Sequence, residues 1–183
     1  LYHARAAASA ALALGVPADL VREALESFHG AFGRMERFRA RGRDVVLALV
    51  KNPVGFNEVI RILVEDRSPK RLLIAINDNL ADGTDVSWLW DVDFERLEGA
   101  EVPFVVTSGI RAEDMAVRLK YAGVDPGVIE VRPDLPDALE HALGRVEPGE
   151  TLFVLPTYTA MLALRALVHR LGFAPDFWRE GRA

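Results

Sequence analysis

Three aspartates and two asparagines crowd residues 77–85 (NDNLADGTD) of this 183-residue chain. This composition is typical of a turn, because Asp, Asn and Gly readily satisfy local backbone groups. A carboxylate held there could also orient a histidine, as the third member of a catalytic triad does, or bind magnesium. Trp88 and Trp90 follow directly. We expect at least one of them to be largely buried and to fix the segment, and the other to face a partner.

Other polar residues suggest contacts with a nucleotide or a phosphate. Lys51, Asn52 and Asn57 surround a proline, which is consistent with a simple turn from a strand into a helix. Alternatively, Asn52 and Asn57 hydrogen-bond a nucleotide, with Lys51 nearby. Arg34 lies in a predicted linker, where it is either a solvated charge or a group that reaches a phosphate across a domain cleft. Residues 107–109 (TSG) favour either an anion-binding helix N-terminus or an ordinary helix cap.

Composition excludes several other kinds of chemistry. The chain has no cysteine, which excludes a disulfide framework, a thiolate metal site and a cysteine nucleophile, and suits a reducing cytoplasm. The four histidines have no metal-ligand spacing and no obvious acid/base partner in the sequence, so we expect no metal site; they are His3, His29, His141 and His169. The formal net charge of −5 argues against a nucleic-acid partner. Every apolar run is shorter than the roughly 20 residues that span a bilayer, so we expect no membrane insertion.

Alternating apolar runs and helical patterns predict the scaffold that positions these residues. Near-continuous apolar runs of this length are typical of strands buried on both faces. We expect strands at residues 44–50, 71–76, 103–106, 128–131 and 151–155, and helices at 55–65, 111–122, 135–143 and 158–171. This alternation predicts a Rossmann-like, three-layer α/β domain with a mostly parallel sheet. In such sheets, sites lie beyond the carboxyl ends of the strands, where the polar residues fall.

The start of the chain has a different character. Residues 2–14 are rich in alanine and leucine and predict a helix, and residues 18–28 predict a second one after a Gly-Val-Pro break. Residues 29–37 contain two glycines and several charges, which indicates a linker. The chain also begins in mid-pattern without methionine. We therefore expect residues 1–31 to be the helical tail of a domain that continues upstream, and residues 32–183 to form the α/β domain.

Several segments resemble the Mur ligase family, from the end of its central ATPase domain onward. They are the alanine-rich helix, residues 33–36 (GRME) and the strand that ends in Asn-Pro at residues 49–53 (LVKNP). Amino-acid-adding Mur ligases usually end this strand in a D-Y-A-H-N-P type motif, whose acidic residue and histidine are missing here. This departure points to the MurT branch, a subunit of lipid II isoglutaminyl synthase. Its C-terminal domain is similar to the segments KNPVGFNEVIR, INDNLADGTDVSWLWDVDFE, TSGIRAEDMAVRLKYAG and LPTYTAML.

The resemblance implies an activity for the full-length protein. MurT proteins use ATP and magnesium to activate the α-carboxylate of D-glutamate in lipid II, and a GatD-like glutaminase supplies the ammonia that amidates it. The C-terminal domain docks the glutaminase, and an aspartate of its D-N-x-A-D motif completes the partner's Cys-His pair. Here that aspartate is Asp78, which leaves the strand directly, or alternatively Asp82. The amidation of lipid II is expected to take place in the cytoplasm, at the inner face of the membrane.

The same resemblance places Arg34 and Asn52 where Mur ligases contact the nucleotide, with Lys51 and Asn57 as further candidates. Residues 1–31 then correspond to the tail of the central ATPase domain. The phosphate loop and the zinc ribbon of MurT proteins have no counterpart in this sequence, so we expect the chain alone to bind neither ATP tightly nor zinc. Two alternatives are a docking module whose aspartates have no chemical part, and the C-terminal domain of an amino-acid-adding Mur ligase.

Overall fold

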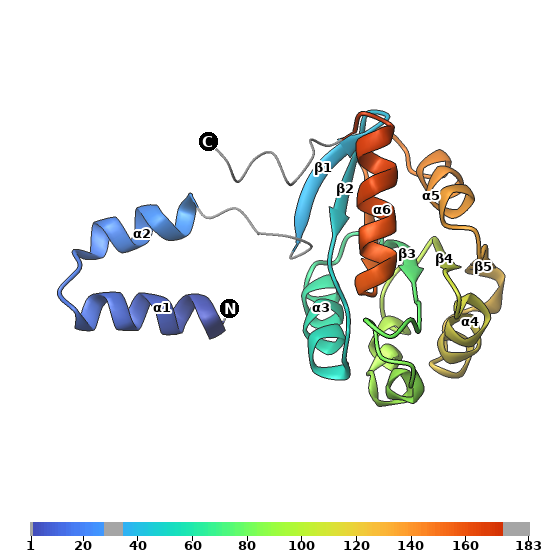
Figure 1. Ribbon diagram of the computed structural model, residues 1–183, viewed down its shortest axis with the longest axis horizontal. Coiled ribbons are helices and arrows are strands. Elements are labelled where there is room, and N and C mark those ends of the chain that lie inside the picture. The colour runs from blue at the N-terminus through green and yellow to red at the C-terminus, as the bar shows by residue number, and fades with distance from the viewer. Residues whose placement is uncertain (1, 28–34, 174–183) are drawn as a thin grey trace. The chain divides into compact units, whose positions relative to one another are not determined.

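The computed structural model describes residues 2–27 and 35–173 and divides the chain into two compact units, Leu1–Ala31 and Phe32–Ala183 (Figure 1). The first unit is a pair of helices, α1 (Tyr2–Ala13) and α2 (Ala18–Glu26). Gly15 separates them with φ +83°, a conformation that glycine adopts without strain. No residue of α2 is buried. That this unit is the tail of an ATPase domain stays a prediction.

The second unit is built on a six-stranded sheet with the order β1-β2-β6-β3-β4-β5. The strand β1 is antiparallel to β2, and all other neighbours are parallel. The bounds are β1 (Glu36–Ala40), β2 (Arg43–Leu47), β3 (Arg71–Ala75), β4 (Phe104–Ser108), β5 (Ile129–Val131) and β6 (Thr151–Pro156). The mostly parallel sheet expected from the apolar runs is confirmed.

Helices cover both faces of this sheet. They are α3 (Pro53–Glu65), α4 (Ala112–Tyr121), α5 (Leu135–Gly144) and α6 (Tyr158–Arg170), with short 3-10 helices η1 (Ser87–Asp91), η2 (Phe94–Leu97) and η3 (Pro126–Val128). One hydrophobic cluster joins the sheet to α3, α4, η1 and η2, and a second joins it to α5 and α6, which crosses in front of the sheet in Figure 1. Along β3, Leu72 and Ile74 belong to the first cluster and Leu73 to the second. This alternation gives the three layers that the sequence predicted.

The strand β1 was not expected, because residues 29–37 were interpreted as a linker. Its sequence, ERFRA, is mostly charged, and its exposed and partly buried residues alternate. A charged strand is tolerated at the edge of a sheet, where charges discourage pairing with other chains. Arg41 and Gly42, with φ +50° and +78°, form the tight turn into β2. The composition of this segment is therefore typical of a linker, although the segment forms a hairpin with β2.

None of the helices within residues 2–27 and 35–173 is long and apolar enough to cross a membrane.

Candidate functional site

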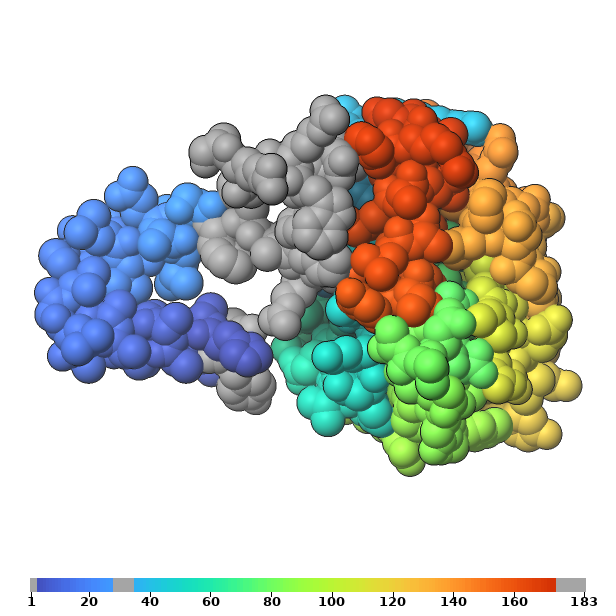
Figure 2. All heavy atoms as spheres, in the orientation of Figure 1, coloured from blue at the N-terminus to red at the C-terminus, as the bar shows by residue number. Residues whose placement is uncertain are grey.

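The carboxyl ends of three neighbouring strands bring distant polar segments together. In the register of the sheet, Ala75 of β3 lies opposite Ser108 of β4 and Pro156 of β6. The segments that follow these residues therefore meet at one edge, as expected for a parallel sheet. The space-filling view shows the segment after β3 (green) at the surface beside the start of α6 (red) (Figure 2).

Asn77 joins these three segments. Its backbone N–H donates to Thr157 Oγ1 (2.9 Å), its Nδ2 donates to Thr159 Oγ1 (2.9 Å), and its Oδ1 accepts from the N–H of Ile110 (3.0 Å). The side chain is part-buried, so these bonds are shielded from water. We did not single out Asn77 from the sequence. An amide residue placed directly after a buried strand was the signal that could have indicated it.

Asp82 is hydrogen-bonded to the start of α6. Its Oδ1 accepts from the N–H of Thr159 (2.8 Å), and its Oδ2 accepts from Thr159 Oγ1 (2.6 Å). Asn79 Nδ2 donates to the same hydroxyl (2.9 Å). A carboxylate at this place satisfies a free N–H of the first helical turn and interacts favourably with the helix dipole. Asp82 therefore has a structural task in which each of its oxygens accepts one hydrogen bond from Thr159.

Asp78 has a different environment. Its Oδ2 accepts a hydrogen bond from Arg111 Nε (2.8 Å) and forms an ion pair with Arg111 Nη2 (2.6 Å). Hydrogen bonding to Asp78 raises the pKa of Arg111 above its usual value. Asp78 Oδ1 accepts no hydrogen bond within the described part of the chain, where the one fully buried side-chain polar atom without a partner is Thr107 Oγ1. Asp78 Oδ1 therefore reaches the surface, from a side chain that is only 17% exposed.

The backbone N–H groups of residues 109–111, which lead into α4, are already hydrogen-bonded within the domain. The N–H of Gly109 donates to the Pro133 carbonyl (3.1 Å), and the N–H of Arg111 donates to the Ile76 carbonyl (2.9 Å). The N–H of Ile110 is used by Asn77. Gly109 has φ +85°, and a Cβ there would lie 2.6 Å from both Asn77 Oδ1 and the Ile76 carbonyl oxygen. The glycine is thus required by the close approach of two loops rather than by a ligand.

The candidates for nucleotide contact lie at the end of β2 and in α3. Asn52 Oδ1 accepts from the N–H of Gly55 (2.8 Å), which makes Asn52 the N-cap of α3. Asn57 Oδ1 accepts from the N–H of Asp93 (2.8 Å) and so holds the start of η2. Lys51 is exposed, and Arg34 lies outside the described residues. The turn from strand to helix is therefore observed, and Lys51 Nζ and Asn52 Nδ2 have no hydrogen-bond partner among the described residues.

The tryptophan segment is fixed mainly by the residue between the tryptophans. Leu89 is 2% exposed, Trp88 is partly buried against Phe56 (ring centroids 6.5 Å apart), and Trp90 is 56% exposed beside Tyr121. The expected burial of a tryptophan is met only in part, by Trp88, and residues 87–91 form the 3-10 helix η1 instead of an extended segment. Its turn brings Leu89, instead of one tryptophan, onto the core.

Arg118 is a buried residue that the sequence analysis missed. It is 3% exposed, and it donates from Nε to the Leu89 carbonyl (3.1 Å) and from Nη2 to the Val92 carbonyl (2.6 Å). It also forms an ion pair with Glu95 (2.9 Å), whose pKa is lowered by this hydrogen bond. Arg118 shares a helix face with Met115, Leu119 and Ala122, and this apolar spacing was the available signal.

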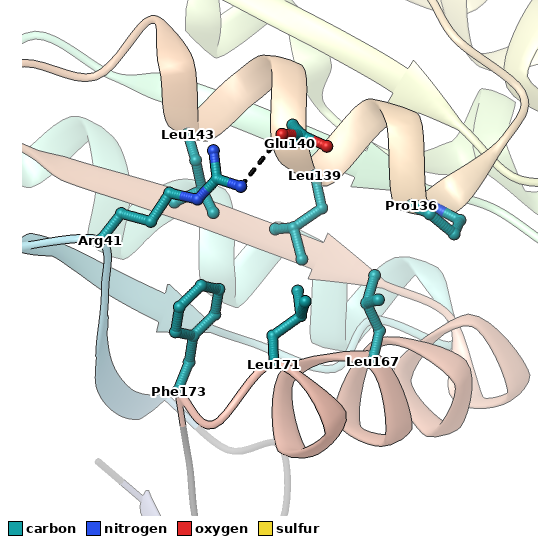
Figure 3. A pocket seen from close by; sticks show the side chains of 8 residues that line it. All are labelled: Arg41, Pro136, Leu139, Glu140, Leu143, Leu167, Leu171 and Phe173. Atoms are coloured by element: carbon teal, nitrogen blue, oxygen red, sulfur yellow. Dashed lines mark hydrogen bonds and ion pairs between the residues drawn. The ribbon is translucent and has the colours of Figure 1, made fainter.

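A separate cavity of about 190 Å³ lies away from these residues, between α5, the end of α6 and the turn before β2. Leucines of the two helices point toward each other across it, and the Arg41–Glu140 ion pair (3.0 Å) closes one side (Figure 3). Its lining is Arg41, Pro136, Leu139, Glu140, Leu143, Leu167, Leu171 and Phe173. None of the predicted site residues that the structure describes contributes to it. Among the described residues, no group of three or more His, Asp or Glu side chains is arranged to hold a metal ion.

The architecture defines a class of protein, the Mur-type ligase fold. One solved structure that shares it is the UDP-N-acetylmuramate-alanine ligase MurC from Thermotoga maritima, with a TM-score of 0.60 and 19% identity over 92% of this chain and 36% of that chain. Another is the Mycobacterium tuberculosis folylpolyglutamate synthase complexed with ADP, with a TM-score of 0.56 and 21% identity over 87% and 36%. At these identities the likeness shows the fold alone.

The sequence is more specific than the fold. The model of the MurT ligase C-terminal family matches residues 49–161, and the chain belongs to this family. It is 34% identical over 170 residues to the lipid II isoglutaminyl synthase (glutamine-hydrolyzing) subunit MurT of Streptococcus pneumoniae, covering 92% of this chain and 37% of that protein. The MurT subunit of Staphylococcus aureus (strain COL) is 31% identical over 169 residues, covering 92% and 38%. The predicted MurT branch is thus confirmed, for a chain that spans less than two fifths of these relatives.

Proposed function

We propose that this chain is the C-terminal part of an ATP-dependent ligase subunit that amidates the D-glutamate α-carboxylate of lipid II. The carboxylate is activated as an acyl phosphate, and ammonia from a glutaminase partner displaces the phosphate. The reaction belongs to the longer protein, at the cytoplasmic face of the membrane. The part assigned to this domain is to dock the glutaminase and to present Asp78 to the partner's Cys-His pair. The names of the MurT relatives support this assignment.

The observation that carries this proposal is the position of the Asp78 carboxylate and the way in which its two oxygens are bonded. It follows a buried strand, one oxygen is held by Arg111, and the other reaches the surface. A fixed carboxylate can accept a hydrogen bond from an imidazole N–H, set its tautomer and stabilise the imidazolium. Both oxygens of Asp82 already bind Thr159, so turning Asp82 toward a partner would break its bonds to α6. The geometry therefore favours Asp78 over Asp82 as the residue offered to the partner.

ATP and magnesium belong to the same proposal. ATP supplies the phosphoryl group that activates the carboxylate. The nucleotide would meet this domain at Lys51 Nζ and Asn52 Nδ2, because Asn52 Oδ1 and Asn57 Oδ1 already accept backbone N–H groups. Arg34 would add a second cation. In this proposal the magnesium ligands belong to the full-length ligase.

Two exposed apolar side chains beside Asp78 suit a docked partner. Leu80 is 92% exposed and Ile110, next to Arg111 in sequence, is 56% exposed. The hydrogen bond between Asn77 and Ile110 keeps their loops adjacent. Apolar residues around a polar centre exclude water from it when a partner covers them. We therefore assign the glutaminase contact to this surface, the docking surface of Leu80 and Ile110.

Binding of the glutaminase tests the docking surface directly. Changing Leu80 and Ile110 together to Asp is expected to weaken the complex by about tenfold or more, because two apolar contacts become desolvated charges. Calorimetry with the purified glutaminase subunit gives the Kd. The matched control is Val54→Asp, a change at an apolar side chain that is 75% exposed on α3. Equal weakening by the control, or an unchanged Kd for the double variant, would place the docking surface elsewhere.

The competing function is a docking module without a chemical part. It shares the docking surface but predicts that Asp78 can change without loss of glutamine hydrolysis. Measuring complex formation and hydrolysis on the same Asp78 variant separates the two functions. Retained binding with lost hydrolysis supports the proposal, and retained binding with normal hydrolysis supports the docking module.

A further inference from the structure

We propose that Arg111 is a positioning residue for the glutaminase reaction, which orients Asp78 toward the partner's histidine. This inference rests on the proposed function and names a residue that acts through Asp78. Arg111 cannot accept an imidazole proton, since it is a donor only. Its contribution is to decide which oxygen of Asp78 is offered, and in which direction.

The first argument is the way the two side chains meet. Nε of Arg111 donates to Oδ2 of Asp78 at 2.8 Å, and Nη2 forms an ion pair with the same oxygen at 2.6 Å, which leaves Oδ1 unbonded among the described residues. Rotation of an aspartate carboxylate about its last bond is otherwise broad and nearly two-fold. The planar fork of a guanidinium restricts that rotation more than a single point charge can. Arg111 therefore selects one carboxylate orientation from several.

The second argument is that the backbones of Asp78 and Arg111 are both fixed at the end of β3. Asp78 lies just beyond β3, and the N–H of Arg111 donates to the carbonyl of Ile76, at 2.9 Å. The adjacent Ile110 N–H donates to Asn77 Oδ1, and the tight approach at Gly109 admits no Cβ. The Arg111 backbone is thus fixed relative to β3 before any partner arrives. Such pre-organisation avoids ordering the carboxylate during binding.

The third argument concerns the remaining nitrogen of the guanidinium. Nη1 of Arg111 donates to Asp114 Oδ2 at 3.3 Å, from the first turn of α4. The guanidinium is therefore held from a second side and is only 37% exposed. An arginine fixed by its backbone and by Asp114 can act as a rigid support for the more deeply placed Asp78.

The test uses Arg111→Gln and Arg111→Lys in the complete synthase with its glutaminase. Arg111→Gln is expected to lower kcat for glutamine hydrolysis by about tenfold to a hundredfold, the scale of a small misplacement of a catalytic group. KM for glutamine and the Kd for the glutaminase should stay within about twofold. Arg111→Lys should recover part of kcat, since it restores one charged donor. The matched control, Arg132→Gln, removes a similarly exposed arginine that pairs with Asp137 at 2.8 Å and should leave kcat unchanged.

Combining Arg111→Gln with Asp78→Asn identifies the route of the effect. If Arg111 acts through Asp78, the double variant hydrolyses glutamine no more slowly than Asp78→Asn alone. An unchanged or raised kcat for Arg111→Gln, or a full additional loss in the double variant, overturns the inference while the proposed function stands. Normal hydrolysis by Asp78→Asn overturns the proposed function itself. If Arg111→Gln fails to fold by circular dichroism, Arg111→Lys decides: lowered kcat with intact docking supports the inference, and wild-type kcat overturns it.

Discussion

Asp78→Asn in the complete synthase is expected to lower glutamine hydrolysis by roughly 10²- to 10⁴-fold while the glutaminase remains bound. The amide is nearly isosteric with the carboxylate, so the docking surface keeps its shape. It cannot stabilise an imidazolium and can hold the wrong tautomer; in serine proteases a comparable change costs about 10⁴ in turnover. The lower end of the range applies if the cysteine nucleophile needs less help from its base.

Three further measurements test whether the loss is specific to Asp78 and to glutamine hydrolysis. Amidation of lipid II supplied with free ammonia should survive in Asp78→Asn, because the proposed function assigns activation of the carboxylate to another part of the ligase. Asp137→Asn, which changes an aspartate in a different arginine pair (2.8 Å to Arg132), should hydrolyse glutamine normally. Asp82→Asn should lower stability by about 1 kcal/mol through α6 and affect hydrolysis less than Asp78→Asn. A severe loss in Asp82→Asn with normal hydrolysis in Asp78→Asn would move the role to Asp82.

Arg118→Ala is expected to lower the free energy of unfolding of the α/β domain by about 3 kcal/mol. The change leaves the buried carbonyls of Leu89 and Val92 without their donors and opens space beneath the aromatic rings of Phe94 and Trp90. The ion pair with Glu95 adds little to this figure, because Glu95 is 57% exposed and screened by water.

Chemical denaturation measures this effect with a control from the same segment. Arg96→Ala removes an exposed ion pair with Asp93 (3.4 Å) and should change stability by less than about 0.5 kcal/mol. Arg118→Met fills most of the space without supplying donors, so it should fall between wild type and Arg118→Ala. A loss below about 1 kcal/mol in Arg118→Ala would show that other contacts fix η1 and η2.

The buried part of the fold could be predicted from the sequence because burial leaves a direct pattern. The strands β2, β3, β4 and β6 are covered on both faces, so they read as continuous apolar runs. The strand β1 could not be found in this way, since an edge strand can be charged along its length. Arg118 was missed for the opposite reason. Arginine is rarely buried, and its burial depends on two carbonyls more than 20 residues earlier in the chain.

The candidate site could be located from the sequence but not resolved into roles. A polar segment after a parallel strand predicts a site at the carboxyl edge, whichever aspartate is used. What separates Asp78 from Asp82 is their partners, Arg111 and Thr159, which lie 33 and 77 residues further along the chain. No pattern in the neighbouring sequence predicts hydrogen bonds between residues so far apart in the chain. The same holds for Asn77, whose three bonds join segments from β3, β4 and β6.

The structure of this domain bound to the glutaminase tests the central claim most directly, through one distance. We predict that Asp78 Oδ1 lies about 2.6–3.2 Å from a ring nitrogen of the partner's catalytic histidine, with Arg111 still bound to Oδ2. Leu80 and Ile110 should be covered by the partner in the same structure. A complex in which Asp78 faces solvent, or in which a carboxylate of the glutaminase itself holds that histidine, would contradict the proposed function.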